Sequence, residues 1–320
     1  MPDKSIASLS QASPIPIEIQ EDDGKSFGPY RKSSKIIPIL KSVQKYSSYT
    51  FTIFSFLHGV NVLVVPSIST GIAEEILSMN RSIYQATGLE NILVWGSLSV
   101  HILSGALMRI IRNWRYRERY GGSRAHDNKL KRKRRDSHLD HEVISQNYEG
   151  EVNINDDSEV GLMGGLTNYF GFGFKKSLIF RYFGLSPLQA TGYLSIPLVL
   201  YHSLQVRIIP NIVEGDSSYI NFDFISYLFN NNKHYSGPIL NWIIYPALIS
   251  FTTYHIISGW MKLLNVRSLT KRKIGATIVN IISLLGIYSL YTITKIDCHS
   301  SVAQFIQKRF DMYIDYFYLS

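Results

Sequence analysis

The sequence has very little cysteine, and it has no acidic residues inside its long apolar runs. Cys298 is the only cysteine, so the chain cannot form an intrachain disulfide or supply the several thiolates of a metal cage. The acidic residues nearest the apolar runs, Glu74, Glu75 and Glu90, all lie at the ends of those runs. The runs contain no carboxylate pair, nucleophile elbow or acidic phosphate-metal motif. We therefore expect a protein without enzymatic activity.

The first 47 residues lack the features of a cleaved targeting peptide. They carry the acidic patch EIQEDD, and they show neither an apolar core nor an arginine-rich amphipathic face. A secretory signal needs the apolar core, and a mitochondrial matrix presequence needs the basic face. Targeting is therefore expected to come from the apolar runs themselves.

Long apolar runs dominate the rest of the chain. Hydrophobic residues make up 45% of the sequence, yet the mean hydropathy is +0.01, because very apolar blocks alternate with polar ones. A run of about 18 or more apolar residues is long enough to cross a bilayer as a helix. Such runs occur at 48–68, 91–112, 190–212, 238–263 and 275–294. The predicted fold class is all-α, a polytopic membrane helix bundle with about five transmembrane helices.

Lysine and arginine residues are distributed unequally between the segments that join these runs. The N-terminal tail and the connections 113–189 and 264–274 are basic, whereas the other two connections contain one basic residue each, Arg81 and Lys233. Basic loops tend to stay on the cytosolic side of a membrane. This bias predicts a cytosolic N-terminus and places the C-terminal tail, 295–320, on the opposite side.

The first long connection contains a segment of opposite charges, 115–160, in which cationic KLKRKRR precedes acidic DHEVISQNYEGEVNINDDSE. Such segments are typically solvated and without fixed structure. The alternative is that the basic half contacts anionic lipid headgroups beside a span. A multi-spanning core confines the protein to a membrane, so nucleic acid is not expected as a partner.

The histidines inside the runs belong to an internal repeat. The matched residues are His58, Val62 and Pro66 with His202, Val206 and Pro210, and His101, Ser104 and Gly105 with His255, Ser258 and Gly259. A glycine four residues after a histidine lies on the same helical face, where it lets a neighbouring helix or a flat macrocycle approach the backbone. Two helix-pair repeats and a fifth helix are predicted, with segment boundaries 1–47, 48–112, 113–189, 190–263, 264–294 and 295–320.

An ionisable side chain in the middle of a membrane indicates a functional site. His58, His101 and His202 each lie about ten residues into their runs, which predicts positions near the bilayer middle at ~1.5 Å per residue, and His255 lies nearer the basic side. One hypothesis is axial ligation of haem b by pairs of neutral imidazoles, with His58 paired to His202 or to His101. Haem iron would then be the only metal. The alternative is that each histidine bonds a backbone carbonyl or a serine of the next helix.

The H-x-x-S-G pattern at His101 and His255 resembles the haem-ligand helix of the cytochrome b membrane subunits of succinate dehydrogenase and fumarate reductase. In that family an Arg-His pair follows shortly after the glycine, whereas ALMR and WMK follow here. The resemblance therefore implies haem ligation, and it implies neither a quinone site nor a respiratory role.

Residues 48–294 as a whole resemble a fungal family of five-span mitochondrial outer-membrane proteins concerned with lipid homeostasis and organelle contacts, the MDM10-complementing type. The resemblance rests on HGVNVLVVP, NILVWGSLSVHILSGALMR, SLIFRYFGLSPLQATGYLSIPLVLYHSLQVRIIP and YHIISGWMK. It implies a non-enzymatic membrane anchor and adaptor that lies among the membrane lipids of that organelle.

In that family the cytosolic N-terminal tail is understood to recruit a bridge-like lipid-transfer protein of the chorein type through a Pro-x-Pro motif. This chain carries Pro14, Ile15, Pro16 and Ile17 in SLSQASPIPIEIQ. Two prolines spaced by one residue favour an extended backbone and lower the ordering cost of binding, and flanking isoleucines suit strand addition. Two other functions stay open: a b-type haem protein, and a lipid scramblase, which would need a polar groove between helices.

Overall fold

A computed structural model of the chain describes residues 36–86, 88–120, 162, 185–231, 236–266, 268–297, 302 and 304–318. The motif residues Pro14, Ile15, Pro16 and Ile17 and most of the charged connection lie outside the described residues. Every regular element within the described residues is a helix. The predicted all-α fold class is therefore confirmed.

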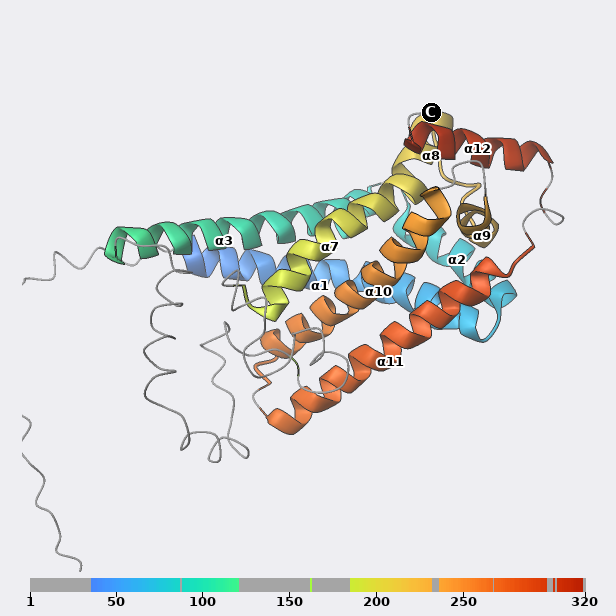
Figure 1. The fold of residues 1–320 in the computed structure, drawn as a ribbon. Coiled ribbons are helices and arrows are strands. Elements are labelled where there is room, and N and C mark those ends of the chain that lie inside the picture. Colours follow the sequence, from blue (N-terminus) through green and yellow to red (C-terminus); the bar gives the residue numbers. More distant parts are fainter. Residues whose placement is uncertain are drawn as a thin grey trace, which may run out of the picture.

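Long helices form the body of the molecule: α1 (Ile36–Leu63), α3 (Ser97–Tyr120), α7 (Pro187–Ser203), α10 (Ser236–Leu263) and α11 (Leu269–Thr294). α1 packs against α3, α7 packs against α10, and α11 packs against both α1 and α10. The partners within each pair run in opposite directions, so α1 and α11 begin, and α3 and α10 end, at the same end of the molecule (Figure 1). We call this the basic end, since it carries exposed Lys41, Lys45, Lys262 and Lys271.

Four helical segments of the described chain are long and apolar enough to cross a membrane: Ile36–Ser67, Asn91–Arg115, Pro187–Glu214 and Thr270–Thr294. α10, the expected fourth span, is not in this set because buried polar residues such as Asn241, Tyr245 and Thr253 interrupt its apolar sequence. Its 28 residues would extend about 42 Å at 1.5 Å per residue. α10 packs between α7 and α11, which fits the prediction of about five transmembrane helices.

The first helix is longer than the apolar run that predicted it. α1 begins at Ile36, twelve residues before the run that starts at 48. Ile36, Ile39 and Val43 keep its first turns apolar on one face, and all three side chains are exposed. Lys41 and Lys45 lie in the same turns, where long cationic stems can reach lipid headgroups.

Two π-helical segments lie towards the opposite end of the molecule. η2 (Asn91–Gly96) leads into α3, and η3 (Leu204–Ile208) joins α7 to α8 (Ile209–Glu214). Such segments are rare in proteins, and those that do occur often lie at functional sites. At Gly96 a Cβ would lie 2.6 Å from the Asn91 carbonyl oxygen, so glycine is required where this π-helical turn closes.

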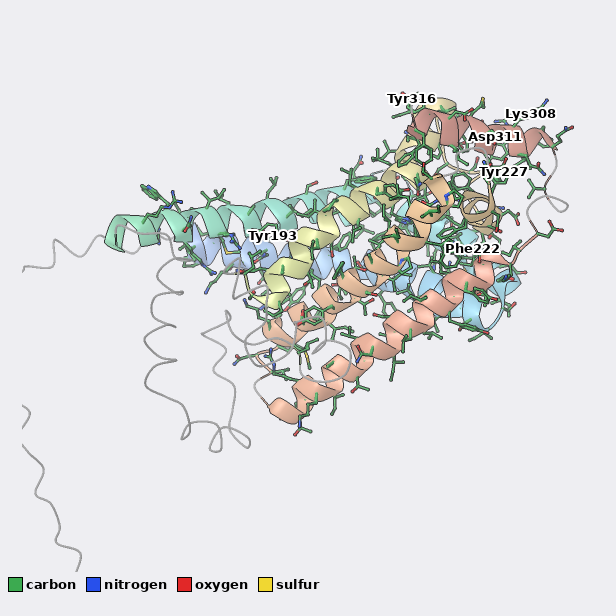
Figure 2. The ribbon with its side chains drawn as sticks, viewed as in Figure 1. Tyr193, Phe222, Tyr227, Lys308, Asp311 and Tyr316 are labelled. Carbon is green, nitrogen blue, oxygen red and sulfur yellow. The ribbon has the colours of Figure 1, made fainter. Side chains whose placement is uncertain are left out.

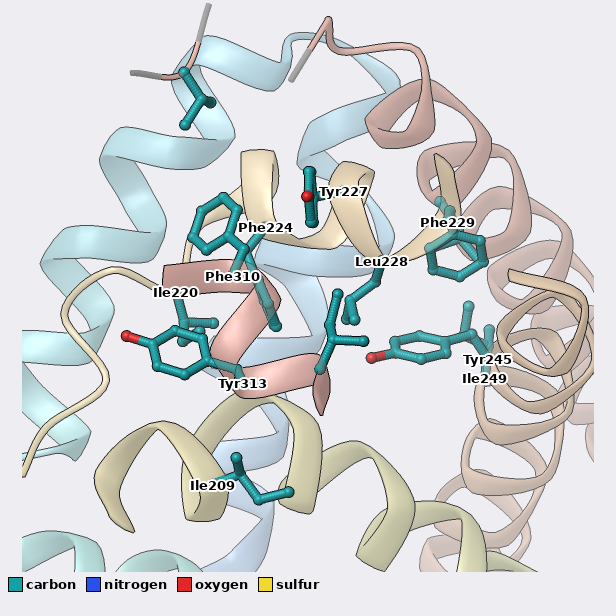
Figure 3. Close-up of a cluster of buried hydrophobic side chains, with 13 residues drawn as sticks. Ile209, Ile220, Phe224, Tyr227, Leu228, Phe229, Tyr245, Ile249, Phe310 and Tyr313 are labelled. Atoms are coloured by element: carbon teal, nitrogen blue, oxygen red, sulfur yellow. The ribbon is translucent and has the colours of Figure 1, made fainter. Parts of the chain in front are cut away.

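Shorter helices cover the end opposite the basic end. They are α2 (Thr70–Tyr84), which follows the turn η1 (Val65–Ser67), α9 (Phe222–Asn230) and α12 (Gln304–Tyr318). Figure 3 shows the buried hydrophobic cluster that α9 and α12 form with α8 and α10. Within it, Phe224 packs edge-on against Phe310, with ring centroids 5.0 Å apart. Where α9 meets α12 (Figure 2), the hydroxyl of Tyr227, another member of this cluster, donates to Asp311 at 2.8 Å.

We expect Phe310→Ala to destabilise this end of the molecule. Phe310 is 0% exposed, whereas Phe305 of the same helix is 60% exposed. Truncating a buried phenylalanine costs about 3–5 kcal/mol, so thermal unfolding of the detergent-solubilised protein should shift to a lower temperature. Phe305→Ala is the matched control and should leave the midpoint nearly unchanged. Equal shifts for the two variants would contradict the packing described here.

Candidate functional site

The four histidines inside the long helices are arranged as two pairs. His58 of α1 faces His202 of α7, and His101 of α3 faces His255 of α10. In both pairs the ring centroids are 6.1 Å apart. Each histidine pair therefore joins one helix of the α1–α3 pair to one helix of the α7–α10 pair. Of the two partners that the sequence allows for His58, the structure brings His202 close.

The two histidine pairs lie at different levels of the bundle. The Tyr245 ring contacts His202, with centroids 5.4 Å apart, and Tyr245 precedes His255 by ten residues on α10. At 1.5 Å per residue the levels are about 15 Å apart along the helices. The sequence predicted that His101 shares the level of His58 and His202. The structure shows that this prediction is wrong, because His101 lies at the level of His255. Depth counted from the start of an apolar run misplaces His58, because α1 begins twelve residues before its run.

Equivalent hydrogen bonds hold His101 and His255. Nδ1 of His101 lies 3.4 Å from the carbonyl oxygen of Gln44, and Nδ1 of His255 lies 3.0 Å from that of Leu188. A carbonyl oxygen only accepts, so each Nδ1 carries the proton and donates it. In a neutral imidazole this leaves Nε2 with a bare lone pair.

These two hydrogen bonds show the sequence repeat in three dimensions. Gln44 precedes His58 by 14 residues on α1, and Leu188 precedes His202 by 14 residues on α7. The histidine of the second helix in each pair therefore bonds the equivalent place on the first helix. At the level of His101 and His255, the structure therefore shows the bond from a histidine to a backbone carbonyl of another helix, which was the alternative to haem ligation.

The glycines of the repeat face the same two positions. A Cβ on Gly105 would lie 2.8 Å from Nε2 of Gln44, and a Cβ on Gly259 would lie 3.9 Å from Cδ1 of Leu188. Both glycines thus border the contact between the two helices of a pair. The space is tight at Gly105 and ordinary at Gly259.

Gly192 of α7 provides the space that His255 occupies. A Cβ at Gly192 would lie 2.7 Å from Cε1 of His255. This glycine stands outside the matched segments, so the repeat gives no signal for it. Ser104 and Ser258, which do belong to the repeat, donate to carbonyl oxygens of their own helices and do not bridge to a neighbour.

Aromatic side chains surround His58 and His202. His58 stacks on Phe54 with centroids 5.3 Å apart and meets the edge of Tyr84 at 6.4 Å. Burial raises the pKa of the Tyr84 phenol to about 12, so this wall is uncharged. Nδ1 of both histidines is buried and has no hydrogen-bond partner among the described residues. A buried polar atom without a partner costs about 1–3 kcal/mol, so these two nitrogens need an explanation.

The ligand set fits iron in a macrocycle better than a metal ion held by side chains alone. The described residues contain no group of three or more His, Cys, Asp or Glu side chains that could hold a metal ion, and structural zinc sites need more ligands than a pair. Haem iron needs only a pair of axial ligands. Imidazole nitrogens bind metals at about 2.0–2.1 Å, so two rings on opposite sides of one ion have centres roughly 6 Å apart. The observed separation is 6.1 Å in both pairs.

Comparisons with known proteins cover the same helices. The family described as MDM10-complementing protein 1, transmembrane domain, matches residues 53–178 and 197–298, which include all four histidines. The Mitochondrial adapter protein MCP1 of Saccharomyces cerevisiae is 28% identical over 277 residues, which cover 85% of this chain and 80% of that protein. No solved structure matches the chain. The resemblance inferred from the apolar segments is confirmed, and because the family match covers more than half of the sequence, this chain belongs to the MDM10-complementing protein 1 family.

Proposed function

We propose that this chain is a non-enzymatic adaptor of the mitochondrial outer membrane, which supports lipid homeostasis by recruiting a bridge-like lipid-transfer protein to organelle contact sites. The observation that carries this proposal is the family membership, together with a relative whose name describes a mitochondrial adapter protein.

The helical bundle supports the anchoring part of this function. Four segments of the described chain are long and apolar enough to anchor it in a membrane. The first helix of the bundle, α1, begins at Ile36. Ile36 follows Ile17 by 19 residues, which reach at most about 65 Å when fully extended. A partner docked on Pro14, Ile15, Pro16 and Ile17 can therefore sit well outside the headgroup layer and stay tethered to the membrane.

The charges of the bundle support a cytosolic N-terminus. The start of α1 lies at the basic end, where Lys41, Lys45, Lys262 and Lys271 are exposed. Lysine and arginine near the ends of spans favour the cytosolic side. A tail on that side is accessible to a soluble or vesicle-bound partner.

The structure gives little support to lipid scrambling by the core. A groove of about 780 Å³ runs along α1 and the start of α3, and its lining is mainly apolar, with Ile39, Val43, Tyr46 and Ile92 among the residues. A headgroup that crosses the bilayer needs polar partners along its path, since an unsatisfied polar group is costly in hydrocarbon. This groove suits the acyl chains of surrounding lipid instead.

Replacing both Pro14 and Pro16 with alanine should abolish recruitment of the lipid-transfer protein, because the pre-extended backbone is lost and the ordering cost of binding rises. Imaging of the tagged partner on mitochondria, with this protein tagged separately, measures the recruitment. Pro29→Ala, in the same tail, is the matched control and should recruit normally. Recruitment that survives the double substitution would exclude the motif.

The proposed orientation predicts how Cys298, the only cysteine of the chain, reacts with a membrane-impermeant maleimide. α11 begins at the basic end and ends at Thr294, so the proposed topology predicts that Cys298, four residues later in the sequence, is on the opposite side of the membrane. In intact mitochondria the reagent should spare Cys298 until the outer membrane is opened. It should label a Ser33→Cys, Cys298→Ser variant at once, and the reverse pattern would place the N-terminus inside.

A further inference from the structure

We propose that the two histidine pairs are two separate bis-histidine sites for haem b, one formed by His58 and His202 and the other by His101 and His255. The proposal concerns the core of the bundle and goes beyond the adaptor role of the tail. Three observations on the described residues carry it: the contact between the helix pairs, the hydrogen bonds of the imidazoles, and the neighbouring arginines.

The α1–α3 pair and the α7–α10 pair meet each other mainly through side chains, since the close backbone approaches lie within each pair and along α11. Apart from the histidines, this contact includes Tyr49, which stacks on Trp260 with centroids 5.1 Å apart. The Trp260 indole also donates to the Thr52 hydroxyl at 3.2 Å. A flat macrocycle can enter such an interface by moving side chains, and the helix contacts within each pair stay in place.

The imidazoles are prepared for coordination in two different ways. At the level of His101 and His255, the hydrogen bonds from Nδ1 to backbone carbonyls fix the tautomer and leave Nε2 as the ligand atom, as in many metal sites. At the level of His58 and His202, Nδ1 lacks a partner among the described residues. At this level iron bound at Nδ1 would give each ring the partner that the protein does not supply, with the proton carried by Nε2.

Two arginines lie near the His58–His202 level. Glu90 already pairs with one of them, Arg207, and the other, Arg81, fits a ligand that carries carboxylates, as haem b does through its propionates. Arg207 follows His202 by five residues on the same continuous helix, and its Nε donates to Glu90 at 2.7 Å. Arg81 donates to the carbonyl oxygens of Ile220, at 2.5 Å, and of Ser217. No carboxylate of the described chain lies within ion-pair distance of Arg81. A half-buried guanidinium of this kind is a ready partner for an anionic oxygen.

The other level has one arginine in a comparable place. Arg109 follows His101 by eight residues on α3, and its guanidinium lies over the Tyr193 ring, 5.5 Å from the centroid. Tyr193 directly follows Gly192, which borders His255. Each histidine pair thus has a cation within a few helical turns, on the side towards the nearer end of the molecule.

The two sites should differ in reduction potential. A hydrogen bond from Nδ1 to a carbonyl makes the imidazole a more basic ligand, which favours ferric over ferrous iron. His101 and His255 both donate such bonds. Neither ring nitrogen of His58 or His202 makes a hydrogen bond to a described residue. The His101–His255 site is therefore expected to have the lower potential.

The test is an optical spectrum of the full-length protein, purified in mild detergent and incubated with hemin, with haem quantified per chain. We expect about two haem groups per chain and a b-type reduced-minus-oxidised spectrum. His58→Ala and His101→Ala should each remove one haem, while His126→Ala, in the charged connection, should remove none. A wild-type chain that takes up no hemin would overturn the proposal, as would a stoichiometry unaffected by both variants.

A second substitution separates ligation from misfolding. His101→Met keeps a ligand atom and should convert one site to histidine–methionine ligation, with a shifted spectrum and a raised potential. In a redox titration of the wild type, the component that disappears in His101→Ala should be the lower of the two. The opposite assignment would overturn the inference from the Nδ1 hydrogen bonds. Recruitment of the tail's partner by these histidine variants should be unchanged, so failure of the haem proposal and failure of the adaptor proposal give different results.

Discussion

A helix in lipid has no water to satisfy a free polar group, so a buried polar side chain of this bundle is costly unless it finds a partner. Within α1, the hydroxyls of Ser48, Thr52 and Ser55 donate to carbonyl oxygens one turn back. Between α11 and the first helical segment, Ser289 donates to the carbonyl of Leu63 at 2.9 Å. Polar residues that weaken an apolar run in the sequence are thus satisfied by their own helix or, as at Ser289, join two helices.

The same constraint explains how α10 can carry polar side chains in its interior turns. The Asn241 amide donates to the Leu228 carbonyl at 2.9 Å, and its oxygen accepts from the Tyr201 hydroxyl at 2.8 Å. Tyr245 donates to Gln205 at 3.0 Å. These side chains point into the protein and tie α10 to α7, η3 and α9. A helix that is surrounded by protein can carry them, because its polar groups find fixed partners.

Sequence reasoning located the helices and the histidines, since long apolar runs and a repeated H-x-x-S-G pattern are local signals. It left the partner of His58 open, because periodicity shows which residues share a face of one helix but does not show which helix that face meets. Backbone partners such as the Gln44 carbonyl leave no trace in a side-chain pattern. α12 was missed because its charged residues, Lys308, Arg309 and Asp311 among them, hide a short amphipathic helix behind an apparently polar tail. The motif at Pro14 to Ile17 rests on family resemblance alone.

α11 has no counterpart in the repeat, and this affects how the molecule assembles. Protein synthesis proceeds from the N-terminus, so α1, α3, α7 and α10 are complete before α11 leaves the ribosome. The α1–α3 pair and the α7–α10 pair can each form independently, because the hydrogen bond from histidine to backbone carbonyl lies within the pair. α11 then joins them at Gly286, where a Cβ would lie 2.8 Å from Leu63 of α1 and 3.0 Å from Ile249 of α10. A chain that stops before residue 269 therefore holds two finished helix pairs without the helix that joins them, and α11, the last of the long helices to be translated, completes the bundle.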